Sequence, residues 1–115
     1  MLKDKSFKFA VRIVNLCKHL CEKKKEFVLS KQILRSGTSV GAMIREAEHS
    51  ESRVDFVHKM AIAQKEINET LYWLELLKET EYISDKGFDG INADAVEIIK
   101  MLTSSIKTAK LTTNR

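Results

Sequence analysis

Hydrophobic side chains recur every three or four residues along most of the chain, which is the spacing of one face of an α-helix. The pattern predicts helices at roughly residues 5–25, 31–49, 53–81 and 85–110, and no segment shows the alternation of a half-buried strand. There is no proline to break these helices, and the short links between them make successive helices antiparallel. The sequence therefore predicts an all-α protein, an antiparallel up-and-down four-helix bundle in which residues 1–115 form a single domain.

The expected core residues keep heptad spacing within each predicted helix. They are Phe9, Ile13, Leu16 and Leu20; Ile33, Gly37, Val40, Ile44 and Ala47; Phe56, Met60, Ala63, Ile67, Thr70, Leu74 and Leu77; and Phe88, Ile91, Ala95, Ile98, Leu102, Ser105 and Ala109. Serine is a good N-cap residue, so Ser30, Ser52 and Ser84 are the expected caps of the last three helices. The residues from Thr112 onward are expected to form a loose tail.

Two glycines lie in the middle of the second predicted helix. Gly37 and Gly41 each cost up to about 1 kcal/mol there relative to alanine. We therefore expect a neighbouring helix to approach closely at these positions.

A second apolar strip on the third predicted helix exceeds what a lone bundle needs. Ile62, Trp73 and Leu76 lie well to one side of its core stripe. Such a strip indicates a protein partner or a self-association surface, so these residues are the candidate oligomer interface. Ion pairs between helices or between subunits are expected from two arginines and two glutamates: Arg35, Arg45, Glu66 and Glu69.

Positive charge is concentrated in one segment of the chain. The net charge is +4, and residues 1–30 hold eight Lys or Arg against three Asp or Glu. The candidate nucleic-acid contacts are Lys18, Lys23, Lys24, Lys25, Lys31 and Arg35. The alternative is a solvated helix end, since lysines suit the C-terminal end of a helix dipole. Phe27 is the aromatic residue close to these lysines, and its exposure decides whether a base could stack there.

Two motifs have the spacing of metal ligands in bundle enzymes. Glu46 with His49, and Asp55 with His58, keep the three-residue step found in di-iron bundles. Both lie near the link between the second and third helices, away from the middle of the bundle. Solvated charge and capping explain them better, so a metal-dependent bundle enzyme is the weakest of three hypotheses. We expect no metal site, no cofactor and no catalytic residue.

The cysteines and the apolar runs exclude other classes of protein. Cys17 and Cys21 lack a second ligand pair for zinc and are expected to be buried, unreactive thiols. No apolar run approaches the ~20 residues that cross a bilayer, and the first residues lack the pattern of a signal peptide. We therefore expect a cytoplasmic protein without a membrane partner.

Several short motifs together resemble the four-helix proteins of the 23S ribosomal RNA intervening-sequence family. They are residues 29–42 (LSKQILRSGTSVGA), 44–47 (IREA), 55–56, 62–63, 66, 69–70 and 73–74, together with the last helix at 98–110. One position departs from the pattern, because Met43 stands where the family usually has asparagine.

The resemblance implies homopentameric rings, and a similarity to the basic, nucleic-acid-binding accessory protein of diversity-generating retroelements. The favoured hypothesis is therefore a non-enzymatic homo-oligomeric bundle, a pentameric ring with weak, charge-driven binding of RNA or DNA. The alternative is a protein-interaction scaffold without nucleic-acid binding.

Overall fold

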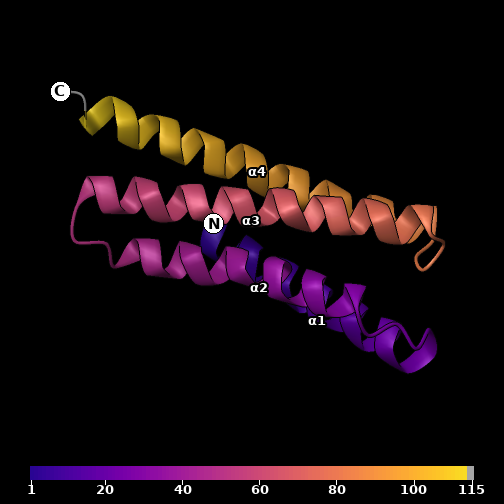
Figure 1. The fold of residues 1–115 in the computed structure, drawn as a ribbon. Coiled ribbons are helices and arrows are strands. Elements are labelled where there is room, and N and C mark those ends of the chain that lie inside the picture. Colours follow the sequence, from indigo (N-terminus) through magenta and orange to yellow (C-terminus); the bar gives the residue numbers. More distant parts are fainter. Residues whose placement is uncertain (114–115) are drawn as a thin grey trace.

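The computed structural model describes residues 1–113 and contains within them four α-helices and no strand. The helices are α1 (Leu2–Lys23), α2 (Leu29–Glu48), α3 (Arg53–Glu79) and α4 (Asp85–Thr113). They run alternately in opposite directions and form a rod of 52 × 21 × 20 Å (Figure 1). The predicted all-α, four-helix architecture is confirmed.

Each helix packs mainly against its neighbours in the sequence. α2 packs against α1 and α3, α4 packs against α3, and the contact between α1 and α4 is the smallest of the four. Within residues 1–113, no Cα atom of one helix lies within 8 Å of a Cα atom of the diagonal helix. The seam between α1 and α4 carries two ion pairs, Lys5 with Glu97 at 2.9 Å and Arg12 with Asp94 at 2.5 Å.

The heptad stripes form the core almost as predicted. Leu16 and Phe56 are only half-buried. The stripe of α4 steps by four residues after Leu102, which buries Ile106 and leaves Ser105 half-exposed. The prediction for Ser105 was wrong because the four-residue step places a larger apolar side chain against the core.

Two of the three predicted helix caps are confirmed. The Ser52 hydroxyl accepts a hydrogen bond from the backbone N–H of Asp55 at 3.0 Å. The Ser84 hydroxyl accepts one from the backbone N–H of Gly87, also at 3.0 Å. Each serine therefore satisfies a free donor in the first turn of its helix.

The prediction for Ser30 was wrong. α2 begins at Leu29, so Ser30 lies inside the first turn, and its hydroxyl donates to the carbonyl of Glu26 at 2.9 Å. The expected tail was also wrong at its start, because α4 continues to Thr113. The rest of that tail, residues 114–115, lies outside the described residues.

The two glycines of α2 have different surroundings in the structure. A Cβ atom on Gly37 would lie 2.8 Å from a side-chain carbon of Ile13, so the predicted close approach of α1 is confirmed there. A Cβ atom on Gly41 would meet nothing nearer than 3.5 Å, where it would reach Ser6. That is an ordinary contact, so packing of α1 on α2 does not require a glycine at Gly41.

Candidate nucleic-acid interface

A tight turn, residues 24–28, joins α1 to α2. Lys25 adopts a left-handed backbone conformation with a φ of 55°, which reverses the chain after the end of α1 at Lys23. The backbone N–H of Glu26 then donates to the carbonyl of Leu20 at 2.9 Å. Backbone contacts therefore define the turn, and the lysine side chains around it are left to solvent.

Five lysines surround this turn, and all of them are exposed. They are Lys18, Lys23, Lys24, Lys25 and Lys31. None forms an ion pair with any residue of the described part of the chain. Unpaired lysines are available for phosphate groups, so the structure brings together five of the six expected basic contacts.

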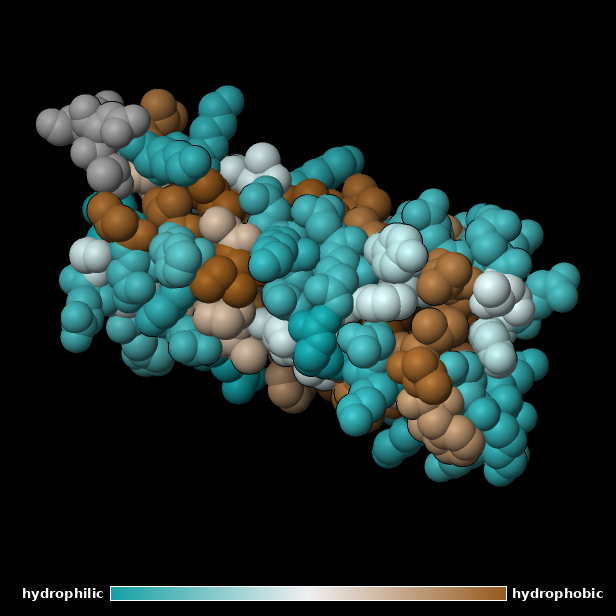
Figure 2. Space-filling model, in the orientation of Figure 1, coloured by the Kyte–Doolittle hydropathy of each residue, from teal (hydrophilic) through white to brown (hydrophobic). Residues whose placement is uncertain are grey.

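Phe27 and Val28 project from the tip of the turn. Their side chains are 60% and 71% exposed, respectively. Figure 2 shows hydrophobic side chains at this end of the molecule, where α2 begins and α3 ends. An exposed aromatic ring beside unpaired lysines is the combination that single-stranded nucleic acid requires, because the ring stacks on a base while lysines contact the backbone.

Glu26 is buried beneath the turn and caps α2, a role that the sequence analysis assigned to Ser30. Its carboxylate accepts hydrogen bonds from the backbone N–H groups of Val28 at 3.2 Å, Leu29 at 3.0 Å and Ser30 at 2.8 Å. Burial on its own raises the pKa of Glu26, but these donors and the Ser30 hydroxyl outweigh burial and lower the pKa. An ionised carboxylate therefore satisfies the first turn of α2 at neutral pH.

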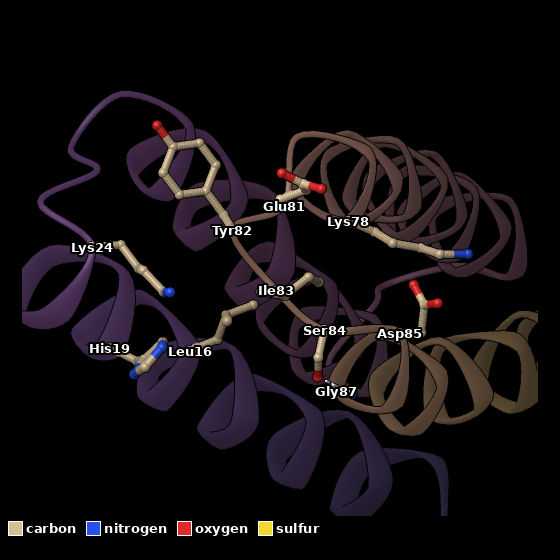
Figure 3. Close-up of a pocket in the computed structure, with 10 residues that line it drawn as sticks. All are labelled: Leu16, His19, Lys24, Lys78, Glu81, Tyr82, Ile83, Ser84, Asp85 and Gly87. Carbon is tan, nitrogen blue, oxygen red and sulfur yellow. Dashed lines mark hydrogen bonds between the residues drawn. The ribbon is translucent and has the colours of Figure 1, made fainter.

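A cavity of about 670 Å³ lies beside the turn, between α1 and the link from α3 to α4 (Figure 3). His19 and Lys24 line it on the α1 side, while Lys78, Glu81 and Asp85 line the opposite side. Its mixed charges do not suit a polyanion. The surface suited to phosphate is therefore the α1–α2 side of this end, not the cavity.

Arg35, the sixth expected basic contact, lies between two carboxylates of α3. Its guanidinium donates to Glu66 at 3.2 Å and also to Glu69. Glu69 in turn accepts the indole N–H of Trp73 at 3.0 Å. Arg45 does not join this network. Its guanidinium carbon instead lies over the ring of Phe7 on α1, 5.1 Å from the ring centroid. Arg35 is therefore committed to holding α2 against α3 and is not free for phosphate.

The three residues of the predicted oligomer interface are all half-buried on α3. We call Ile62, Trp73 and Leu76 the α3 strip. Helical spacing puts them on the same side of α3 as Glu69, which binds both Trp73 and Arg35 of α2. Trp73 packs against the core, so part of its ring stabilises the single chain. The strip thus keeps partial apolar exposure along about four turns of helix.

The two cysteines lie one turn apart on α1, in different surroundings. Burial, then the neighbouring Cys21 and Glu26, raises the pKa of Cys17 to about 11, and its thiol donates to the carbonyl of Ser30 at 3.3 Å. Cys21 is only half-buried. The thiolate is the reactive form, so the expected inertness is supported by structure most clearly for Cys17.

We expect one fast and one slow thiol towards iodoacetamide in the native protein at mildly alkaline pH. Cys21 should react first, while Cys17 should react only as the protein unfolds, because it stays protonated and buried. Mass spectrometry of the modified peptides measures both rates. Cys21→Ser should leave no fast site, and a fast reaction at Cys17 in that variant would contradict the assignment.

The possible metal ligands do not come together. No group of three or more His, Cys, Asp or Glu side chains is arranged to hold a metal ion in residues 1–113. Over the same range, no helix is both long and apolar enough to cross a bilayer.

Comparison with known proteins identifies the family of this chain. A family model described as 23S rRNA-intervening sequence protein matches residues 2–104. The chain belongs to the 23S rRNA-intervening sequence protein family. It is also 63% identical to a solved structure from Bacteroides thetaiotaomicron VPI-5482, described as a protein with unknown function from the S23 ribosomal protein family. The alignment covers 93% of this chain and 99% of that chain, with a TM-score of 0.92. No curated protein matches this sequence.

The structure shows the surroundings of Met43, the residue that departs from the pattern of the resemblance. Met43, where the resemblance leads us to expect asparagine, is half-buried and packs against the core. This chain therefore has an apolar contact on α2 where an amide side chain would offer hydrogen bonds.

Proposed function

We propose that this protein is a non-enzymatic, cytoplasmic, self-associating helical bundle that binds RNA or DNA through the turn between α1 and α2. The observation that carries the proposal is the exposed ring of Phe27 among five lysines that form no ion pair within the described part of the chain. Lysines release counterions from a nucleic-acid backbone when they neutralise phosphates, and the ring adds a stacking surface for a base.

Self-association supplies affinity that one turn cannot. Each chain carries a net charge of +4, so the pentameric ring that the family resemblance implies would carry about +20, enough to steer a polyanion at low salt. Five turns on one ring would also bind a single strand at several points, with an effective concentration set by the ring. The half-exposed α3 strip supports self-association.

Neutralising the turn should weaken binding of single-stranded RNA and flatten its dependence on salt. For Lys23→Gln/Lys24→Gln/Lys25→Gln, we expect affinity to fall about tenfold at ~50 mM salt, and the slope of log affinity against log salt to fall by about 2. Phe27→Ala should weaken binding about fivefold or more without changing the slope, because stacking is not ionic. Fluorescence anisotropy at about 50 and 200 mM salt measures both quantities.

The matched control is a variant that loses the same number of positive charges on α4, away from the turn. Lys100, Lys107 and Lys110 are exposed lysines of α4, and their triple change to glutamine should leave affinity within about twofold. Equal losses from the two triple variants would show diffuse attraction without a site at the turn. No binding by the wild-type protein at the lower salt would refute the nucleic-acid proposal.

The alternative function is a protein-interaction scaffold, and the α3 strip is the observation that favours it. In that case the purified complex would contain a specific protein partner and no nucleic acid. Leu76→Glu would then release the partner, whereas neutralising the lysines of the turn would not.

A further inference from the structure

The cavity between α1 and the link from α3 to α4 contains apolar surface that the core does not cover. Leu16 of α1 and Ile83 of the link line the cavity, and both are only half-buried. Leu16 holds a core position of its heptad stripe, yet it remains in contact with the cavity beside the smallest of the four helix seams. A cavity of about 670 Å³ with such a surface has room for a flat ring from outside the chain.

Hydrogen-bonding groups of opposite kind lie on the two sides of this apolar surface (Figure 3). Lys24 and His19 lie on the α1 side, and the Lys24 side chain extends toward Leu16. The carboxylates of Glu81 and Asp85 lie on the opposite side. The cavity therefore offers an ammonium donor on one side and carboxylate acceptors on the other.

The two carboxylates are available to a ligand. Neither Glu81 nor Asp85 forms an ion pair with any residue in positions 1–113. Lys78 lines the same side, but its ammonium lies over the ring of Phe88, 4.7 Å from the ring centroid. Carboxylates without a cationic partner attract hydrogen-bond donors and repel phosphate groups.

Glu81 has a backbone conformation that usually selects glycine. Its φ is 66°, and the backbone N–H of Tyr82 donates to the carbonyl of Leu77 at 2.9 Å, which ends α3 in a Schellman motif. Glycine is the usual residue at this position because a Cβ atom is disfavoured there. The glutamate therefore carries a conformational cost, and residues of this kind concentrate at functional sites.

The cavity adjoins the turn to which we assign nucleic-acid binding. Lys24 belongs to both, since it lies in the turn and lines the cavity. A strand whose phosphates contact the lysines of the turn therefore has the cavity beside it. The carboxylates exclude the backbone of the strand from the cavity, so the group that enters is a base.

We propose that this cavity receives an unpaired base that carries an amino group, and that it selects cytosine over uracil. The inference rests on the proposed function and specifies which bases the site prefers. Cytosine donates from its N4 amino group at one end of its Watson–Crick edge and accepts at O2 at the other end, which matches Glu81 and Asp85 on one side and Lys24 on the other. Uracil has a carbonyl oxygen at both ends, so one oxygen would face a carboxylate.

Oligocytidine and oligouridine of about twelve nucleotides test this selection, because they differ only in the pyrimidine. By fluorescence anisotropy at neutral pH and about 50 mM salt, we expect the wild-type protein to bind oligocytidine about fivefold or more tightly than oligouridine. Glu81→Gln/Asp85→Asn should bring this ratio to within about twofold without weakening the binding of oligouridine, because amides also donate to carbonyl oxygens.

Two further variants separate base selection from charge and from folding. Glu79→Gln/Asp89→Asn removes the same charge from exposed residues that do not line the cavity, and it should keep the ratio. Glu81→Gly should lower the ratio while it raises the denaturant midpoint of unfolding, because glycine suits the left-handed conformation. Circular dichroism should show that all variants are folded.

The outcomes distinguish the cavity from the turn. Equal affinity of the wild-type protein for the two RNAs would overturn the base pocket and leave binding at the turn intact. A ratio that Glu81→Gln/Asp85→Asn retains would also overturn it. No binding of either RNA would instead refute the proposed function, and the pocket with it.

Discussion

Gly37→Ala is expected to lower the free energy of unfolding, whereas Gly41→Ala, four residues away on the same helix, is expected to raise it. A Cβ atom on Gly37 would lie 2.8 and 2.9 Å from two side-chain carbons of Ile13, closer than real contacts allow. Ile13 is completely buried, and a β-branched side chain in a helix has one preferred rotamer, so it cannot move aside. The two helices must therefore separate, at the expense of the core packing around them.

The expected magnitudes follow from two opposing effects. Overpacking costs about 1–3 kcal/mol, while replacing a mid-helix glycine with alanine gains about 1 kcal/mol. We expect Gly37→Ala to lose about 1–2 kcal/mol net, and Gly41→Ala to gain up to about 1 kcal/mol because it meets no close atom. Denaturant unfolding at one fixed protein concentration measures both. Equal stability of the two variants would show that α1 can shift away from α2 at little cost.

Glu26→Ala is expected to destabilise the protein by about 2–3 kcal/mol. It removes the acceptor of three backbone N–H groups at the start of α2, in a buried position where water replaces it poorly. Glu22→Ala is the matched control, because Glu22 is exposed near the end of α1 and should change stability by no more than about 0.5 kcal/mol. Similar losses from both would show that the carboxylate does not cap α2.

At acid pH, the free energy of unfolding of the wild-type protein should exceed that of Glu26→Gln by less than it does at neutral pH. The folded structure lowers the pKa of Glu26, so its carboxylate contributes stability that is fully present above the unfolded pKa of about 4.3. That contribution is lost as the pH falls through the lower, folded pKa. Denaturant unfolding at neutral pH and at successively lower pH should show the two proteins converging, and a constant difference would contradict the assignment.

Features that repeat over many residues could be predicted from the sequence. The stripe from Ile33 to Ala47 continues over four turns of helix, and one misplaced residue does not alter its period. The four helices and most of the core followed from such stripes. Helix ends were less certain, because one contact decides each of them. The Glu26 carboxylate, and not Ser30, caps α2. This contact comes from a single side chain in the preceding turn, so no repeating sequence pattern indicates it.

The candidate site was predictable only in its composition. The lysine cluster is visible in the sequence, but the left-handed conformation of Lys25 and the buried Glu26 together turn Phe27 outward. A five-residue link is too short to show a pattern that would reveal this. The difference between Gly37 and Gly41 likewise depends on how α1 and α2 align, and both residues look the same in the sequence.

The order in which the helices pack has a consequence for how the chain acquires its structure. Three of its four seams join helices that follow each other directly, so each can form once the next helix has left the ribosome. Local contacts of this kind favour fast folding. The seam between α1 and α4 has to wait until α4 is synthesised, and it is also the smallest. The nascent chain can therefore assemble stepwise as hairpins of helices, and the last step closes a structure that is already largely built.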